Sequence, residues 1–282
     1  MFRESSTLRE DSGVSRPMAA ATYNVHGWTG RDSRQIPKRS LKVIREMNCD
    51  VVGLQEATFS LESGDKLTAG YLREMTGMET VLGPTLYRAP WHFGNVLLTR
   101  FPVLRVRRFD LTVRPFEPRG VLDVDLSFRN LELRVLVTHL GLRIRERRFQ
   151  LKSLLERLNP PDGRFIILMG DFNVWFLARR AYRKIHALFG FPPAPRTYPA
   201  AFPLLAFDRI WVHPPSALKN VTAWRSRDSR EASDHLPVRA DLSWKSDLFQ
   251  GKGTPRQGYS PDDGAKEGPR EGRAPATVLQ IA

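Results

Sequence analysis

Residues 165–173 read Phe-Ile-Ile-Leu-Met-Gly-Asp-Phe-Asn, and this stretch decides how the chain folds. Its first five residues are apolar without interruption, which is typical of a β-strand that is covered on both faces. Such a strand needs one layer of structure above it and another below it. Asp171 and Asn173 then follow the strand, so the pattern also predicts a carboxylate and an amide at the rim of a sheet.

Strand and helix patterns alternate along the rest of the chain. Residues 121–126 alternate between apolar and acidic side chains, which predicts an antiparallel strand with one buried face. Apolar residues from Ile144 and Phe149 to Leu158 recur at helical spacing, and arginines fill the other face. The predicted strands are 20–25, 51–54, 94–99, 120–128, 133–139, 165–169 and 207–212, and the predicted helices are 35–48, 66–76, 144–158 and 175–189. Without an internal Pro/Gly-rich linker, these elements predict one layered α/β domain over residues 19–245.

The charge of the chain lies in that domain. The 282 residues include 44 Lys+Arg and 30 Asp+Glu, for a formal net charge of +14. Residues 1–18 and 246–282 each sum to zero, which leaves 36 basic and 22 acidic residues between them. The hydrophobic share of 41% excludes a fibrous or wholly disordered protein. The chain is therefore a basic folded domain with neutral ends, and not a neutral domain that carries a basic tail. Such a domain favours a polyanionic partner.

The two ends are expected to be disordered. Residues 246–282 contain six Gly and four Pro and almost no apolar run, so they cannot bury enough surface to offset the entropy of ordering. Residues 1–17 contain no apolar stretch of the kind that a secretory signal needs, and Met18 is a candidate for the natural start. No segment is long and apolar enough to span a bilayer. With Cys49 as the single cysteine, no intramolecular disulfide can form, and we expect a soluble cytoplasmic monomer without a protein partner.

Polar residues follow one predicted strand after another. They are Asn24, Glu56, His139, Asp171 with Asn173, Asp208, and the pair Asp234-His235. Several strand ends side by side would form one concave acidic site on a basic protein. Taken singly, each residue has a simpler interpretation: Asn24 or Asn173 as a turn residue, Asp234 as a turn cap, and His139 as a hydrogen-bonded core histidine. The repetition of the pattern favours a site.

Six short blocks make this pattern specific. In chain order they are Tyr23-Asn24-Val25-His26-Gly27, Gly53-Leu54-Gln55-Glu56, Thr138-His139-Leu140, Gly170-Asp171-Phe172-Asn173, Asp208-Arg209-Ile210 and Ser233-Asp234-His235-Leu236-Pro237-Val238. Together they resemble the ordered signature of the endonuclease/exonuclease/phosphatase superfamily, over about residues 20–243. The resemblance implies a deoxyribonuclease-I-like fold, a four-layer α/β/β/α sandwich in which two packed β-sheets are flanked by helices. The variants at 94–100 and 208–212 are most similar to bacterial metal-dependent hydrolases of unassigned substrate.

The resemblance also implies a divalent metal ion, usually Mg²⁺, with Mn²⁺ as the alternative. A hard cation prefers oxygen ligands, so Glu56 is the expected direct carboxylate ligand. Asn24 would hold a metal-bound water or a phosphate oxygen. Asp234 would complete the metal or water network.

By the same resemblance, the remaining residues act on the phosphate ester. Asp171 would orient or deprotonate the attacking water, and Asn173 would bind the phosphoryl group. His235 would stand near the scissile phosphate, with its other ring nitrogen donating to Asp208. His139 would donate to a phosphate oxygen or protonate the leaving group.

Several side chains outside the six blocks carry expectations of their own. Arg119 resembles a substrate-contacting position, and His26 and His92 are expected to be structural. Trp28 and Trp175 form either an aromatic rim or packing under loops. Arg143, Arg145, Arg147 and Arg148 are expected on a solvated helix face, and Arg179, Arg180, Arg183 and Lys184 beside the cleft.

These observations predict a Mg²⁺-dependent phosphoesterase, either phosphodiesterase or phosphatase, that uses in-line attack of water. A nuclease would use the basic surface against a phosphate backbone. A lipid-headgroup hydrolase would use it against an anionic leaflet, in peripheral contact with the membrane. The alternative from another class is a catalytically inactive protein that keeps the fold and binds polyanions or membrane surfaces. Such a protein would not require the full set of Glu56, Asp171, Asn173, Asp208 and His235.

Overall fold

The computed structural model describes residues 17–62, 67–128, 131–158, 165–174 and 182–243. Most of the two ends predicted to be disordered, 1–18 and 246–282, lies outside the described residues, as do Trp175, Arg179 and Arg180. Strand β1 already begins at Met18, the last residue of the predicted N-terminal extension. The described part otherwise falls within the predicted domain, 19–245.

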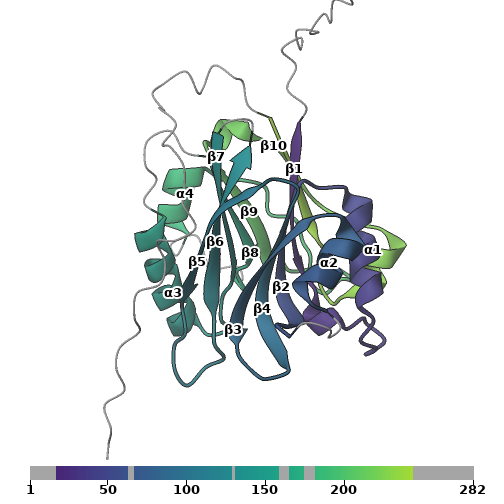
Figure 1. Cartoon of the computed structure of the whole chain (residues 1–282). Helices are drawn as coiled ribbons and strands as arrows, with labels where there is room; N and C mark the ends of the chain where they lie inside the picture. Colours follow the sequence, from purple (N-terminus) through teal and green to yellow (C-terminus); the bar gives the residue numbers. More distant parts are fainter. Residues whose placement is uncertain (1–16, 63–66, 129–130, 159–164, 175–181, 244–282) are drawn as a thin grey trace, which may run out of the picture.

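Two β-sheets form the centre of the molecule (Figure 1). The six-stranded sheet has the order β10-β11-β1-β2-β4-β3, and the five-stranded sheet has the order β5-β6-β7-β8-β9. Among the strands of the described residues, only the pairs β1–β2 and β7–β8 are parallel. The strand bounds are β1 Met18–Asn24, β2 Val51–Ser60, β3 Glu79–Leu86, β4 Trp91–Thr99, β5 Val103–Asp110, β6 Gly120–Phe128, β7 Leu131–His139, β8 Phe165–Asp171, β9 Asp208–His213, β10 Leu218–Ala223 and β11 Val238–Leu242.

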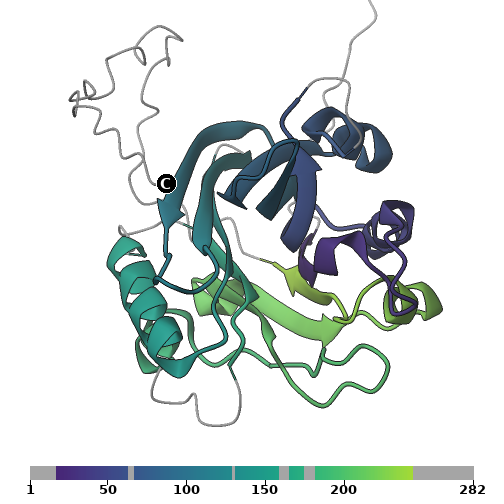
Figure 2. The same cartoon turned by 90° about the horizontal axis from the view of Figure 1, so that it is seen from below.

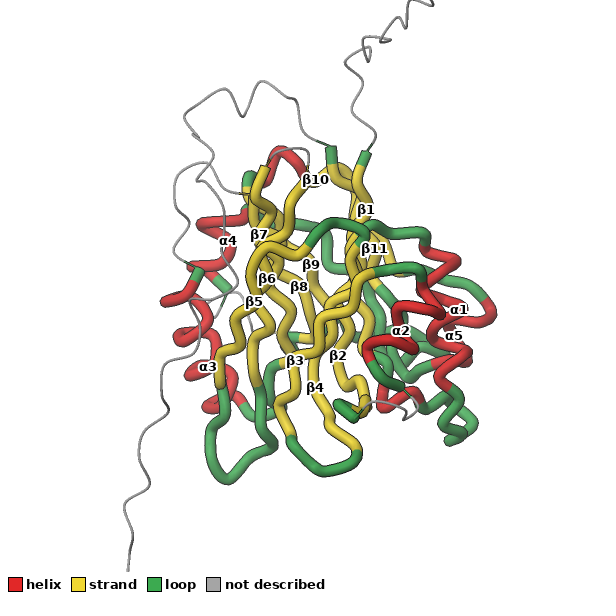
Figure 3. The backbone as a smooth tube through the Cα atoms, in the orientation of Figure 1, coloured by secondary structure: helices red, strands yellow, loops and turns green. Residues whose placement is uncertain are grey.

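Helices cover the outer face of each sheet (Figures 1 and 3). Helices α1, α2 and α5 lie against the six-stranded sheet, and α3 and α4 lie against the five-stranded sheet. Their bounds are α1 Pro37–Met47, α2 Ala69–Thr76, α3 Ile144–Arg157, α4 Arg183–Phe189 and α5 Arg227–Ala232, with 3₁₀ turns at His26–Trp28 and Pro215–Ala217. The predicted four-layer α/β/β/α sandwich is therefore confirmed.

Three apolar layers hold these elements together. The layer between the sheets includes Leu97, Val124 and Met169, all fully buried. A second layer lies under α1 and α2, and a third under α3 and α4. Strand β8 contributes to both faces of its sheet, since Ile167 enters the middle layer and Ile166 the outer one. The uninterrupted apolar run at 165–169 follows from this position.

The strand at 121–126 departs from the expected half-exposed pattern. Leu122 and Val124 point between the sheets, but Asp123 on the other face is fully buried. Asp123 receives hydrogen bonds from Arg107 and Arg134, and Arg107 also binds Asp125. Burial favours a higher pKa for Asp123, but the two guanidinium groups outweigh it and hold the pKa below its ordinary value. The acidic face of β6 is thus an internal ion network.

The buried face of helix α3 also differs from the face predicted to be apolar. Ile144 and Phe149 are exposed, whereas Arg147 is buried. Arg147 donates hydrogen bonds from Nη1 to the carbonyls of Gly141 and Leu142 in the preceding loop. A guanidinium can satisfy carbonyls that a leucine cannot, so Arg147 does not belong to the predicted solvated face.

None of the described helices is long and apolar enough to cross a membrane.

Cys49 is buried, as expected for a packing residue, and burial raises the pKa of its thiol to about 12.

We predict that Arg134→Met destabilises the domain by about 3 kcal/mol, because the buried carboxylate of Asp123 loses one of its two cations. Urea unfolding followed by circular dichroism measures this change. The folded-state pKa of Asp123 is depressed, so its contribution is present above about pH 4 and is lost below it. The difference between wild type and variant should therefore narrow in acid.

Arg105→Met is the matched control, because Arg105 lies on β5 of the same sheet, is exposed, and is not one of the two arginines that bind Asp123. Equal stability losses in the two variants would contradict the structural role of the ion network.

Candidate active site

Three neighbouring strand ends bring part of the site together. In the five-stranded sheet, His139 at the end of β7 is in register with Asp171 at the end of β8. Asp171 is in turn paired with Asp208 at the start of β9. All three side chains are buried. A loop before β11 adds His235 from the other sheet, so residues far apart in sequence share one rim.

Strand β2 brings Glu56 to the same end through a β-bulge. The pairing of β2 with β4 shifts register between Leu54 and Ala57, and Glu56 has a left-handed φ of +54°. A bulge re-aims one side chain without ending the strand. Asn24 ends the neighbouring strand β1 and donates from Nδ2 to Glu56 Oε1 at 2.9 Å and to Asp171 Oδ2 at 3.1 Å. The Asn24 amide thus joins carboxylates from both sheets.

Asp171 is the buried centre of the site. Its Oδ2 atom lies 3.7 Å from Nε2 of both His139 and His235. Burial, reinforced by the negative charge of Asp208, raises the pKa of Asp171 to about 7. The carboxyl group can therefore accept or release a proton near neutral pH.

The two histidines beside Asp171 prefer opposite charge states. Burial holds the pKa of His139 well below its ordinary value, and the nearby cation Arg119 adds to this effect. Burial would also lower the pKa of His235, but the Asp208 carboxylate, 2.9 Å from Nδ1, outweighs it and raises the pKa to about 10. At neutral pH the site therefore contains one neutral imidazole and one imidazolium.

Asn173 is held by the turn that follows β8. Its backbone N–H donates to Asp171 Oδ1 at 2.9 Å, and its Nδ2 donates to the carbonyl of Leu140 at 2.9 Å. The same nitrogen lies 3.0 Å from His139 Nε2. Gly170, with φ +151°, lets the strand pass the carbonyl of Thr138, which a Cβ atom would meet at 1.8 Å. This close approach requires glycine at that position.

Two residues outside the predicted set support His235. Thr197 donates from its hydroxyl group to Asp208 Oδ2. Ser233 accepts from the His235 backbone N–H at 3.2 Å and donates to the carbonyl of Asn24 at 2.8 Å. Ser233 stands within a sequence block that marks the site, but no sequence signal marks Thr197.

Arg119 lies where the site opens into a larger pocket. With Glu56 and His139 it lines a narrow gap, and its Nη1 donates to Glu117 at 2.6 Å. Its buried Nε atom has no hydrogen-bond partner among the described residues. Beyond Arg119 lies a pocket of about 500 Å³ that Tyr87, Arg114 and parts of β3 and β5 line. A bound molecule could therefore contact Arg119 from either side.

Two overlapping donor sets fit a divalent cation. Asp171, Asp208 and His235 each have one atom within 4.8 Å of the others, and His235 can be a ligand in this set once its ring has lost a proton. Asp208 Oδ1 is buried and has no hydrogen-bond partner among the described residues, as expected of an atom that awaits a ligand. Glu56 supplies carboxylate oxygens beside Asp171, and oxygen donors suit a hard cation. The amide nitrogen of Asn24 holds both carboxylates, while its oxygen accepts from the His26 backbone N–H at 3.0 Å.

Asp234 lies beside these sets. Its carboxylate is partly exposed and faces Nδ1 of His26 at 3.8 Å. It also accepts from the Ser233 hydroxyl at 3.4 Å.

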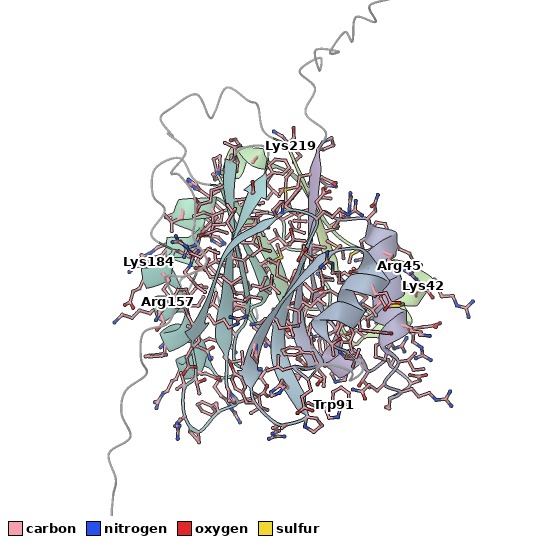
Figure 4. The ribbon with its side chains drawn as sticks, viewed as in Figure 1. Lys42, Arg45, Trp91, Arg157, Lys184 and Lys219 are labelled. Atoms are coloured by element: carbon pink, nitrogen blue, oxygen red, sulfur yellow. The ribbon has the colours of Figure 1, made fainter. Side chains whose placement is uncertain are left out.

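The structure decides one open alternative about the surroundings, the place of Trp28, and corrects one expectation, that Arg183 and Lys184 lie beside the cleft. Trp28 is fully buried, and its Nε1 donates to the carbonyl of Thr58, so it packs under a loop and forms no exposed rim. Arg183 and Lys184 line a groove between α3 and α4, which contains no residue of the predicted site. Lys184 projects from the helical layer (Figure 4). Arg183 and Lys184 follow Asn173 in the sequence, but they belong to α4, which covers one face of the sheet. They therefore do not lie at the rim.

The sequence matches the model of the endonuclease/exonuclease/phosphatase family over residues 21–235. The chain belongs to this family. Every described residue of the site falls within the matched range. The family consists of metal-dependent phosphoester hydrolases, in agreement with the cluster of Asp171, Asp208 and His235.

The relatives extend this likeness over most of the chain. The uncharacterized protein YbhP of Escherichia coli K12 is 32% identical over 241 residues, covering 78% of this chain and 94% of its own. The family protein from Beutenbergia cavernae superposes with a TM-score of 0.66 at 21% identity, covering 81% of this chain and 72% of its own. A mannosyl-6-phosphatase of Bacteroides thetaiotaomicron superposes with a TM-score of 0.62 at 17% identity, covering 80% of this chain and all of its own. At such identities the two structures support the fold alone.

We predict that, in metal-free protein at neutral pH, His235 is an imidazolium and His139 is neutral. Proton–nitrogen correlation NMR reads these states from the ring ¹⁵N shifts. His139→Gln and His235→Gln assign the signals.

Asp208→Asn should lower the pKa of His235, because it removes the charge that offsets burial. An unchanged titration of His235 in that variant would contradict the assigned cause.

Proposed function

We propose that this chain is a Mg²⁺-dependent phosphoester hydrolase in which Asp171 directs a water molecule at the phosphorus atom. The proposal rests chiefly on one observation: Asp171 Oδ2 lies between a neutral and a charged imidazole, 3.7 Å from each. A carboxylate with a pKa of about 7 is matched to taking a proton from water at physiological pH.

The other side chains stabilise the charge that develops on the phosphoryl group. The imidazolium of His235, held by Asp208, donates to a phosphoryl oxygen, and the Asn173 amide donates to another. His139 is neutral and can exchange a proton with the leaving group. Arg119, which lines the pocket and whose Nε atom has no partner among the described residues, contacts the part of the substrate that reaches the pocket.

Glu56, with Asn24 and Asp171 beside it, would hold the cation. When bound, Mg²⁺ supplies positive charge to the phosphoryl oxygens and so favours attack by water. Asp234 remains a proposed member of the metal or water network. Mn²⁺ satisfies the same oxygen ligands, and it accepts an imidazole nitrogen more readily than Mg²⁺ does.

The substrate classes that fit are a nucleic acid and a phospholipid or its headgroup. Both place a phosphodiester in front of a basic surface. Plasmid DNA, RNA and phospholipid vesicles, each with Mg²⁺, Mn²⁺ or EDTA, test them directly.

We predict that Asp171→Asn and His235→Gln each lower kcat for bis(4-nitrophenyl) phosphate by about 10³-fold, because each removes a proton donor or acceptor. Wild-type activity should disappear in EDTA and return with Mg²⁺. Initial rates at saturating substrate measure both effects.

Glu74→Gln, an exposed carboxylate on α2, is the control and should leave kcat unchanged. Near wild-type rates in either site variant would exclude this mechanism. Absence of metal-dependent hydrolysis in the wild type on every substrate would favour the inactive binding protein.

A further inference from the structure

Large apolar side chains are exposed around the mouth of the active site. Leu142 is 66% exposed and Phe202 is 72% exposed, whereas most leucines and phenylalanines of the sheets are buried. The set we call the apolar rim consists of Tyr87, Trp91, Leu142, Ile144, Phe202 and Leu204. Trp91 lies at the lower edge of the molecule in Figure 4, the end that Figure 2 views directly.

Each rim residue belongs to a segment that also carries part of the site. Trp91 begins β4, whose residues Gly94 and Asn95 line the gap beside Glu56. Leu142 and Ile144 lie three and five residues after His139 in sequence. Phe202 and Leu204 lie in the loop between Tyr198, whose ring is 4.9 Å from that of His235, and Asp208. The rim therefore surrounds the mouth from both sheets.

Arginines are interleaved with these apolar side chains. In Leu142-Arg143-Ile144-Arg145 all four residues are exposed. Tyr87 is followed by exposed Arg88, and neither 87–91 nor 142–145 contains an acidic residue. A surface that is both apolar and cationic suits a partner with an anionic outer layer and an apolar interior.

We propose that the apolar rim docks on an anionic lipid bilayer and brings the active site to a phospholipid headgroup. This inference rests on the proposed phosphoester hydrolysis and names its substrate class. Aromatic side chains and leucines enter the headgroup boundary, and the arginines pair with lipid phosphates. A nucleic acid would use the arginines and could stack on Trp91, but it offers nothing apolar to Leu142 and Ile144.

Co-sedimentation of the full chain with vesicles tests the docking. The protein should bind vesicles of equal parts phosphatidylglycerol and phosphatidylcholine, and bind pure phosphatidylcholine far less. Trp91→Ser, and separately Leu142→Ser with Ile144→Ser, should weaken the partition coefficient by about tenfold, since each removes apolar surface from the interface.

Leu104→Ser is the matched control. Leu104 is 57% exposed and lies near the start of β5. The opposite end of that strand, at Asp110, lines the pocket beside the site, so Leu104 lies at the end of β5 away from that pocket. Its vesicle binding should equal that of wild type. Circular dichroism of each variant verifies the fold.

Hydrolysis of soluble bis(4-nitrophenyl) phosphate separates the two proposals. The rim variants should hydrolyse it at the wild-type rate, because no rim residue belongs to the proposed catalytic set. Vesicle binding without any hydrolysis would overturn the proposed function but support the docking surface. Hydrolysis with no binding to anionic vesicles at low salt, or binding that the rim variants leave unchanged, would overturn the docking surface. Two further results would also overturn it: binding of duplex DNA that the same variants abolish, or a dimer in light scattering that they dissociate.

Discussion

The side-chain amide of Asn24 joins the two sheets at the catalytic end, and the candidate site depends on this junction. One nitrogen donates to Glu56 of the six-stranded sheet and to Asp171 of the five-stranded sheet. Both bonds require a fixed spacing between the sheets. Gly53 helps to set that spacing, because a Cβ atom there would meet Met169 Sδ at 2.7 Å. The dense packing of the middle layer therefore determines the geometry of polar groups at its edge.

Burial gives these polar groups their chemical character. Removal from water raises the pKa of Asp171 toward neutrality, while the nearby Asp208 carboxylate keeps His235 charged despite its own burial. Elsewhere in the same sheet, Asp123 is equally buried but has two guanidinium partners, so its pKa falls. The cations around a buried carboxylate thus help to set its pKa, and Asp171, which has no direct arginine partner, is suited to exchange protons.

Much of this arrangement could be predicted from the sequence, since apolar runs that end in polar residues mark strand ends. The apolar pattern identified most of the central strands, but it missed β3, β5 and β10, which lie at sheet edges, and the short strand β11 between β10 and β1. An edge strand such as β5, Val103–Asp110, carries several arginines because one side meets solvent. The bulge that aims Glu56, and the hydroxyl of Thr197 that supports Asp208, depend on tertiary pairing and have no local signature. The same is true of Arg147, whose burial depends on loop carbonyls.

Arg147 also links the interior to the rim. By donating to the carbonyls of Gly141 and Leu142, it supports the loop that follows His139 from the interior of the protein. Gln150 adds a second support, since its Oε1 accepts from the Gly141 N–H at 2.8 Å. The loop backbone is thus satisfied from inside the protein, which leaves the side chains of Leu142 and Ile144 directed outward. Their exposure follows from a buried hydrogen-bond network. The short segment 139–144 thus positions both a proposed catalytic histidine and the surface through which a substrate must approach.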